Sequence, residues 1–172
     1  MSLARYVGRI TPSSVGTAVD ASGRVLLLRR ARAPFAGLWT MPGGKIEPAE
    51  QPRAAMEREY LEETGLPARV ARFCGLVSEI VRSPEGTAHF ILHVFRLQLA
   101  AGGPPGEDFP DAARGPEGEL AWFRPEEIWR RDDVAASDVW MLRHLLLQEG
   151  APRLVEIVSD EADPTRMEVA WL

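Results

Sequence analysis

Most apolar residues of this chain fall in short runs or alternate with polar residues, which is the pattern of β-strands. Two early runs, residues 14–19 and 24–30, are separated by Asp20-Ala-Ser-Gly23, and this spacing predicts a hairpin turn. Leu26, Leu27 and Leu28 are consecutive, so we expect the second of these strands to be covered on both faces. The same pattern predicts further strands at residues 68–82, 87–99, 119–123, 153–158 and 166–171.

Two segments depart from the strand pattern and predict helices. The first begins near Pro52, which suits a first helical turn, and ends before Gly65, a residue favoured just after a helix. The second is expected from about Ser137 to Gln148, with Ser137 as N-cap and Asp138 in its first turn. Strands and helices in this order indicate an α/β fold. The length of 172 residues suits one domain, so we expect a single domain over residues 1–172.

The first predicted helix carries acidic residues where a purely structural helix would avoid them. Glu59, Glu62 and Glu63 stand at positions i, i+3 and i+4, so one face of the helix carries all three. Glu62 and Glu63 also lie in the last turn, where the helix dipole disfavours negative charge by about 0.3–1 kcal/mol each. A divalent cation is the simplest group that would compensate for this repulsion.

A cluster of carboxylates favours hard cations such as Mg²⁺ or Mn²⁺ over zinc. Mg²⁺ usually shares its ligand shell with substrate phosphates, so phosphate-ester or pyrophosphate hydrolysis is the chemistry we expect here. Cys74 is the only cysteine, which excludes a disulfide within the chain and a zinc site built from cysteines.

Composition and charge limit the kinds of partner that the chain is expected to bind. The net charge of −5 argues against a surface for a nucleic acid polymer, although a metal site can still bind a small phosphorylated substrate. No run of residues approaches the length of a membrane span, and the single cysteine fits a cytoplasmic setting. We therefore expect a cytoplasmic protein with no membrane partner.

Residues 44–66 match a known pattern, Gly-x5-Glu-x7-Arg-Glu-U-x-Glu-Glu-x-Gly-U, in which U is a bulky apolar residue. The matched positions are Gly44, Glu50, Arg58, Glu59, Glu62, Glu63, Gly65 and Leu66. The one departure is Tyr60, at a packing position that the family usually fills with Leu, Ile or Val. On this stretch the chain resembles the Nudix hydrolases. That resemblance implies an α/β/α sandwich around a central mixed β-sheet, and metal-dependent hydrolysis of a nucleoside diphosphate linked to another group.

The resemblance also implies roles for individual residues. Glu59 and Glu63 resemble the principal metal ligands, and Glu62 resembles a ligand or a proton acceptor. The carbonyl of Gly43 or Gly44 is a further candidate ligand. Arg58 and Glu50 resemble an ion pair that holds the loop against the helix. For an additional acidic residue from a loop before a late strand, the choice is Glu119, with Glu117 second.

Substrate-binding residues are expected outside the matched stretch. Trp39 is interpreted as core or pocket wall, and Phe35 as a loop aromatic that lines the site. Arg30 belongs to an arginine cluster that is either solvated surface or a phosphate-steering group. Asp138 stands near the second helix, where the animal oxidised-purine triphosphatases read the base with paired aspartates. Only one such aspartate is present here, so the substrate stays open.

The sequence around the signature, GRVLLLRR, GLWTMPGGKIE and ELAWFRPEEI, resembles the MutT-like branch, which hydrolyses nucleoside triphosphates, including oxidised purine ones. The ADP-ribose hydrolases usually have a proline downstream of the signature where Ile80 stands, which counts against them. We therefore expect a nucleoside triphosphate cleaved to the monophosphate and pyrophosphate. The alternatives are an ADP-ribose or sugar-nucleotide pyrophosphatase and a catalytically silent nucleotide-binding module. Many relatives are dimers, so a homodimer is the assembly that the resemblance suggests.

Overall fold

A computed structural model describes residues 3–32, 35–100, 112–163 and 165–171. Its largest element is a six-stranded mixed sheet in the order β10-β9-β5-β6-β1-β4. Strand β1 runs parallel to β6, and β5 runs parallel to β9, while the other neighbours are antiparallel. The six strands are β1 (Ile10–Ala18), β4 (Gly43–Lys45), β5 (Ala68–Ser83), β6 (Gly86–Leu99), β9 (Arg153–Asp160) and β10 (Met167–Trp171).

A second, antiparallel sheet has four strands in the order β3-β2-β8-β7. These are β2 (Val25–Arg30), β3 (Trp39–Thr40), β7 (Ala112–Arg114) and β8 (Gly118–Phe123). The helical elements are a 3₁₀ turn η1 (Leu3–Tyr6), the long helix α1 (Pro52–Thr64), the short helices α2 (Pro125–Ile128) and α3 (Ala136–Met141), and a π-helical turn η2 (Leu142–Leu146). The expected α/β architecture with a central mixed sheet is confirmed.

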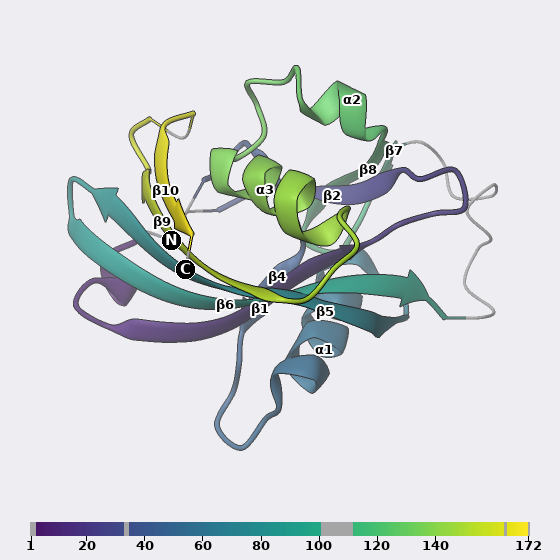
Figure 1. Ribbon diagram of the computed structural model, residues 1–172, viewed down its shortest axis with the longest axis horizontal. Helices are drawn as coiled ribbons and strands as arrows, with labels where there is room; N and C mark the ends of the chain where they lie inside the picture. The colour runs from purple at the N-terminus through teal and green to yellow at the C-terminus, as the bar shows by residue number, and fades with distance from the viewer. Residues whose placement is uncertain (1–2, 33–34, 101–111, 164, 172) are drawn as a thin grey trace.

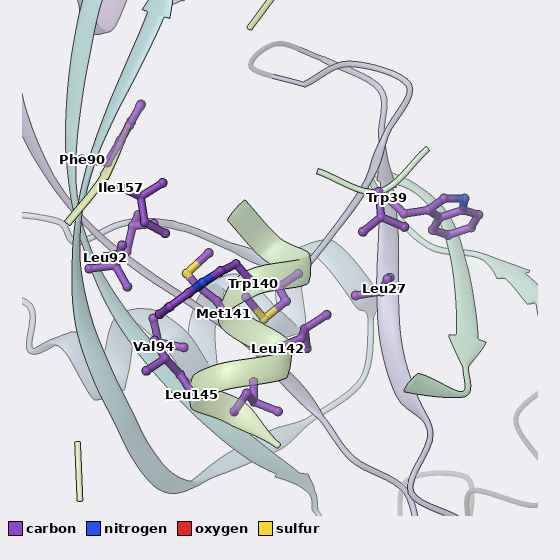
Figure 2. Packing of buried hydrophobic residues seen from close by; sticks show 14 of the residues in the cluster. Leu27, Trp39, Phe90, Leu92, Val94, Trp140, Met141, Leu142, Leu145 and Ile157 are labelled. Atoms are coloured by element: carbon purple, nitrogen blue, oxygen red, sulfur yellow. The ribbon is translucent and has the colours of Figure 1, made fainter. Parts of the chain in front are cut away.

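Helices cover the large sheet from both sides, with α1 below it and α3 above it in Figure 1. Figure 2 shows α3 between Phe90, Leu92 and Val94 of β6 on one side and Leu27 of β2 on the other. All four residues belong to the main hydrophobic cluster, which also holds Trp140 and the leucines of η2.

Strand β2 packs into both hydrophobic clusters of the protein. Four consecutive residues, Val25 to Leu28, are at most 2% exposed. Val25 and Leu27 belong to the main cluster, whereas Leu26 and Leu28 belong to a second cluster with Met56 and Tyr60 of α1. Since successive side chains of a strand point to opposite faces, this run of apolar residues fills both cores, as its sequence predicts.

Three expectations are corrected in detail. The turn at residues 20–23 is present, but β1 and β2 share only an isolated bridge between Val19 and Val25 and then enter different sheets. The helix expected from Ser137 to Gln148 instead begins at Ala136, with no side-chain cap, and ends in the π-helical turn at Leu146. Ser137 does not cap it, because its side chain is buried and hydrogen-bonded to Glu79.

Within the described residues no helix is long and apolar enough to cross a membrane.

Candidate active site

Helix α1 is anchored by its apolar side, which leaves its acidic residues in fixed places. Ala55, Met56 and Tyr60 are fully buried, and Gly65 ends the helix with a φ of 73°, a value that favours glycine. Tyr60, the one departure from the signature, therefore fills a packing position. Leu61, in contrast, is 48% exposed and contributes little to this contact.

Glu63 is the most buried carboxylate of the helix, at 7% exposure. Its Oε2 accepts a hydrogen bond of 2.8 Å from the backbone N–H of Gly43. Burial raises the pKa of Glu63 to about 8, and the negative charges of Glu59 and Glu117 act in the same direction. The hydrogen bond from Gly43 and the charge of Arg30 oppose this shift. Ionisation of Glu63 is thus disfavoured by its burial and by two neighbouring carboxylates, and a bound cation would offset both effects.

Glu59 lies directly against the backbone of Gly44. A Cβ atom at position 44 would stand 2.4 Å from the carboxyl carbon of Glu59, so only glycine leaves room for this carboxylate. Burial raises the pKa of Glu59, and hydrogen bonding to Arg58 lowers it. Gly43 is also constrained, since its φ of 154° and a predicted clash of any Cβ with the carbonyl oxygen of Ser14 both require glycine. The two glycines therefore bring the β4 backbone into contact with both buried acids.

Arg58 connects the helix to the preceding loop. Its guanidinium donates to both carboxylate oxygens of Glu50 at 2.8 Å, to Glu59 at 2.8 Å, to Glu62 at 3.2 Å and to the carbonyl oxygen of Lys45 at 3.1 Å. This pairing holds the pKa of Glu50 down to about 2, because the ionised form accepts the hydrogen bonds. The loop, the helix and Glu59 are thereby tied to one side chain.

Glu62 and Glu119 are placed differently from Glu59 and Glu63. The side chain of Glu62 is 56% exposed and forms an ion pair of 3.2 Å with Arg58. Glu119 is 62% exposed, forms an ion pair of 3.3 Å with Arg29, and does not line the pocket beside α1. Glu117 does line that pocket and acts electrostatically on both Glu59 and Glu63. The structure therefore brings Glu117, and not Glu119, to the pocket.

The pocket beside α1, here called the polar pocket, has a volume of about 570 Å³. Among the described residues, its charged lining consists of five cations and four carboxylates, so the charge of this part of the lining is opposite in sign to the charge of the whole chain. These residues are Arg5, Arg30, Arg32, Lys45, Arg114, Glu47, Glu59, Glu63 and Glu117. The pocket suits an anion that also carries or meets a cation near the carboxylates.

A smaller cavity of about 110 Å³, here called the inner pocket, adjoins the polar pocket. Tyr6, Arg30, Gly43, Gly44 and Lys45 line both. Apolar side chains, among them Val15, Phe35, Val81, Phe90, Leu92 and Met141, form much of its wall. A ligand that fills both pockets would thus have an anionic part and a compact, mostly apolar part.

Two buried acids face the inner pocket, Asp138 of α3 and Glu79 of β5. Asp138 accepts a hydrogen bond of 2.7 Å from the N–H of Met41, and Glu79 accepts one of 2.8 Å from the hydroxyl of Ser159. Burial raises the pKa of Asp138 to about 7, and the charge of Glu79 adds to the shift. Burial also raises the pKa of Glu79.

The other expected substrate-binding residues separate into two groups. Arg30 and Phe35 line the inner pocket together with Asp138, and Phe35 holds a φ of 62°, which is uncommon for a residue other than glycine. Trp39 lies elsewhere: it is 8% exposed, packs edge-on against Phe123 at 5.0 Å and lines neither pocket. The structure therefore places Trp39 in the core.

Glu79 was not among the site residues expected from the sequence, although its position in the sequence is unusual. It occupies the same phase of its strand as Val77 and Val81, which are both buried, so it is a charged residue at an apolar position. Arg5, Tyr6 and Lys45 left no comparable signal, because only the fold brings them to the pockets.

The carboxylates suit a hard divalent cation. Among the described residues, no three His, Cys, Asp or Glu side chains are already grouped as ligands. However, the charge of Glu117 acts on both Glu59 and Glu63, and the charge of Glu59 acts on Glu63. The carboxylate of Glu59 lies so close to Gly44 that any side chain at position 44 would collide with it. Carboxylate oxygens grouped in this way are the donors that Mg²⁺ and Mn²⁺ prefer.

Comparisons with known proteins agree with this geometry. The NUDIX domain model matches residues 11–145. The CTP pyrophosphohydrolase of Escherichia coli is 33% identical over 80% of this chain and 93% of its own length. A putative 8-oxo-dGTP diphosphatase of Mycobacterium tuberculosis is 31% identical over 74% of this chain and 83% of its own. The ADP-ribose pyrophosphatase of Methanocaldococcus jannaschii is 37% identical, but over about half of each chain.

Solved structures show the same fold. A MutT protein from Bacillus halodurans matches with a TM-score of 0.66 over 92% of this chain and 97% of its own, at 23% identity. The E. coli ORF135 protein matches with a TM-score of 0.56 at 27% identity, over 78% of this chain and 87% of its own. With the signature in place on α1 and the family model covering most of the sequence, this chain belongs to the Nudix hydrolases, in their MutT-like branch.

Proposed function

We propose that this protein hydrolyses a nucleoside triphosphate to the monophosphate and pyrophosphate, using Mg²⁺ or Mn²⁺. The observation that carries the proposal is the pair of adjoining pockets. The polar pocket places the buried carboxylates of α1 opposite several cations, as a phosphate chain with a bound cation requires. The inner pocket offers a mostly apolar wall and two buried acids, as a base requires.

The proposed metal ligands are Glu59 and Glu63, supported by Glu62, Glu117 and the carbonyl of Gly43 or Gly44. A divalent cation held there would polarise the phosphoryl oxygens and stabilise the charge that develops in the transition state. Gly43 and Gly44 keep the two carboxylates close to the β4 backbone, and Arg58 fixes the direction of Glu59.

The reaction itself consumes one water molecule. Water adds to one phosphorus of the anhydride, the bridging P–O bond breaks, and the proton of the water is taken up by a nearby carboxylate. Glu62 is our candidate for this last role, because Glu59 and Glu63 are assigned to the metal and the side chain of Glu62 is more exposed to water. Arg30 lies at the border of the two pockets, where it can hold the phosphate next to the nucleoside.

Glu79 and Asp138 would select the base. Burial raises the pKa of both, and the pair is therefore able to retain one proton near neutral pH. A protonated carboxyl donates a hydrogen bond, while its ionised neighbour accepts one. Together they match a base edge that carries both a donor and an acceptor, and they supply the second acid that the sequence lacked beside Asp138.

A second substrate class has support of its own. The partial match to the ADP-ribose pyrophosphatase keeps a sugar-linked nucleoside diphosphate as an alternative. The small inner pocket favours the triphosphate, since it accommodates one compact group rather than a second nucleoside or sugar. A silent nucleotide-binding module is disfavoured because all three glutamates of the signature are present.

The test is a screen of nucleoside triphosphates, ADP-ribose, sugar nucleotides and dinucleotides with Mg²⁺ or Mn²⁺, followed by identification of the products. A monophosphate plus pyrophosphate from one or a few triphosphates supports the proposal. AMP plus ribose phosphate as the main products would instead establish the alternative. No release of product from any of these compounds would leave only the binding module. The homodimer stays a prediction.

A further inference from the structure

The structure assigns to Arg5 a contact with the phosphate chain of the substrate, and residues 3–9, the N-terminal arm, hold Arg5 in place for it. This inference rests on the proposed function and names a phosphate-binding residue outside the Nudix signature. It begins from one observation: the arm forms part of the wall of both pockets. Tyr6 lines both, and Arg5 lines the polar pocket.

The arm is docked on the β5–β6 hairpin rather than lying loosely over the sheet. Leu3 is 1% exposed within the main hydrophobic cluster. The backbone N–H of Ala4 donates to Glu85 at 2.9 Å, Val7 forms a bridge with Ala88, and the N–H of Gly8 donates to the carbonyl of Thr87 at 3.2 Å. These contacts fix the position of the residues between them, including Arg5 and Tyr6.

Tyr6 holds two cations at the pocket. Its ring is buried and packs edge-on against Phe90 at 5.1 Å. The guanidinium carbon of Arg5 lies 4.6 Å from the ring centroid, and Nζ of Lys45 lies 4.9 Å from it. Cation–π contacts restrict both side chains, so two positive charges are held beside one rigid ring.

Two like charges gathered in this way favour a multiply charged anion as their partner. Both residues line the polar pocket, which also contains Glu59 and Glu63. A phosphate chain that reaches the carboxylates through a metal would therefore also meet Arg5 and Lys45. Because the cations are restricted before the substrate arrives, less side-chain entropy is lost on binding. Arg5 belongs to the N-terminal arm, whereas Lys45 belongs to β4, next to the first residue of the signature.

The experiment compares Arg5→Ala and Arg5→Lys with Arg9→Ala in the full-length chain. Arg9 is exposed, belongs to the same arm and lines neither pocket, so it is the matched control. We expect Arg5→Ala to raise the KM for a nucleoside triphosphate by about tenfold, the effect of losing one charge-assisted contact. The value of kcat should stay within about twofold, and Arg5→Lys should recover part of the loss.

Two further readouts separate this role from a structural one. The increase in KM should be the same for different bases, because a phosphate contact does not read the base. Inhibition by inorganic tripolyphosphate should weaken by a similar factor, while the unfolding temperature stays unchanged. If Arg5→Ala and Arg9→Ala behave alike in KM and in tripolyphosphate inhibition, the inference is wrong. If the wild-type protein cleaves no triphosphate, the proposed function fails instead, and calorimetric binding of tripolyphosphate with Mg²⁺ still tests the arm.

Discussion

The two pockets of this protein are adjacent in space but are built in different ways. The carboxylate wall of the polar pocket comes largely from one continuous stretch, residues 43–63, which forms β4, a loop and α1. The inner pocket takes its walls from η1, β1, β4, β5, β6 and α3, which span most of the sequence. The region that we propose for cleavage can therefore be recognised from a local motif, whereas the region that we propose for base selection exists only after folding.

The largest expected effect is at the buried carboxylates. Glu63→Gln should lower kcat by about 10²–10⁴-fold, because it removes an ionisable oxygen that binds metal. Glu62→Gln should have a smaller effect, since that side chain is 56% exposed. Steady-state kinetics at saturating Mg²⁺ and thermal unfolding check both variants. Equal, small losses would mean that the burial of Glu63 has no catalytic meaning.

A change in the backbone next to these acids comes second. Gly44→Ala would place a Cβ 2.4 Å from the carboxyl carbon of Glu59, so we expect the carboxylate to move and kcat to fall by about 10- to 100-fold. Gly23→Ala is the control for a change that strains only the backbone, because its φ of 80° is unfavourable for alanine but no atom beyond its chain neighbours lies within 4 Å of the added Cβ. That control should lose about 1 kcal/mol of stability and no activity.

The inner pocket can be tested without disturbing the chemistry. Glu79→Gln should lower kcat/KM for the preferred base by about 10- to 100-fold and change the order of preference among triphosphates. Asp138→Asn should act in the same direction, and Glu156→Gln, an exposed change on the neighbouring β9, should have no effect. A uniform loss for every base would show that the two acids support the fold and do not read the base.

The last prediction concerns the dependence of stability on pH and does not involve activity. The pKa of Asp138 is raised to about 7 in the folded protein, whereas an aspartate in the unfolded chain titrates near its ordinary pKa of 3.8. The folded state therefore binds more protons, and this contribution is complete below the unfolded pKa and is lost as pH rises through 7. Unfolding in urea should show stability falling by a few kcal/mol, on the order of 1.4 per pKa unit, between pH 4 and 8. Asp138→Asn should flatten this slope.

Sequence reasoning located the elements well where one face or both faces of an element are apolar. The run from Val25 to Leu28 gave a strand buried on both faces, and Pro52 and Gly65 gave the ends of α1. It could not show that β1 and β2 enter different sheets, because a turn such as residues 20–23 has the same local signals in either case. Strand order depends on contacts between segments that are distant in the sequence.

The same limit applies to the site. Glu59, Glu63 and Arg58 were recognised because their spacing is fixed by one helix. Trp39 was placed in the substrate group, but its burial against Phe123 could be seen only in the folded chain. Glu119 belongs to β8 and Glu117 lies just before that strand, so sequence alone could not tell which of them faces the pocket.

Arg58 has a further consequence for how this site tolerates change. An arginine has five N–H donors, and the five hydrogen bonds of Arg58 engage Glu50 twice, Glu59, Glu62 and the carbonyl of Lys45. Its bonding capacity is saturated. A lysine, with three donors and no planar fork, would leave at least two of these acceptors to water. The loop, the helix and Glu59 therefore behave as one rigid unit, and no substitution at this position can preserve it.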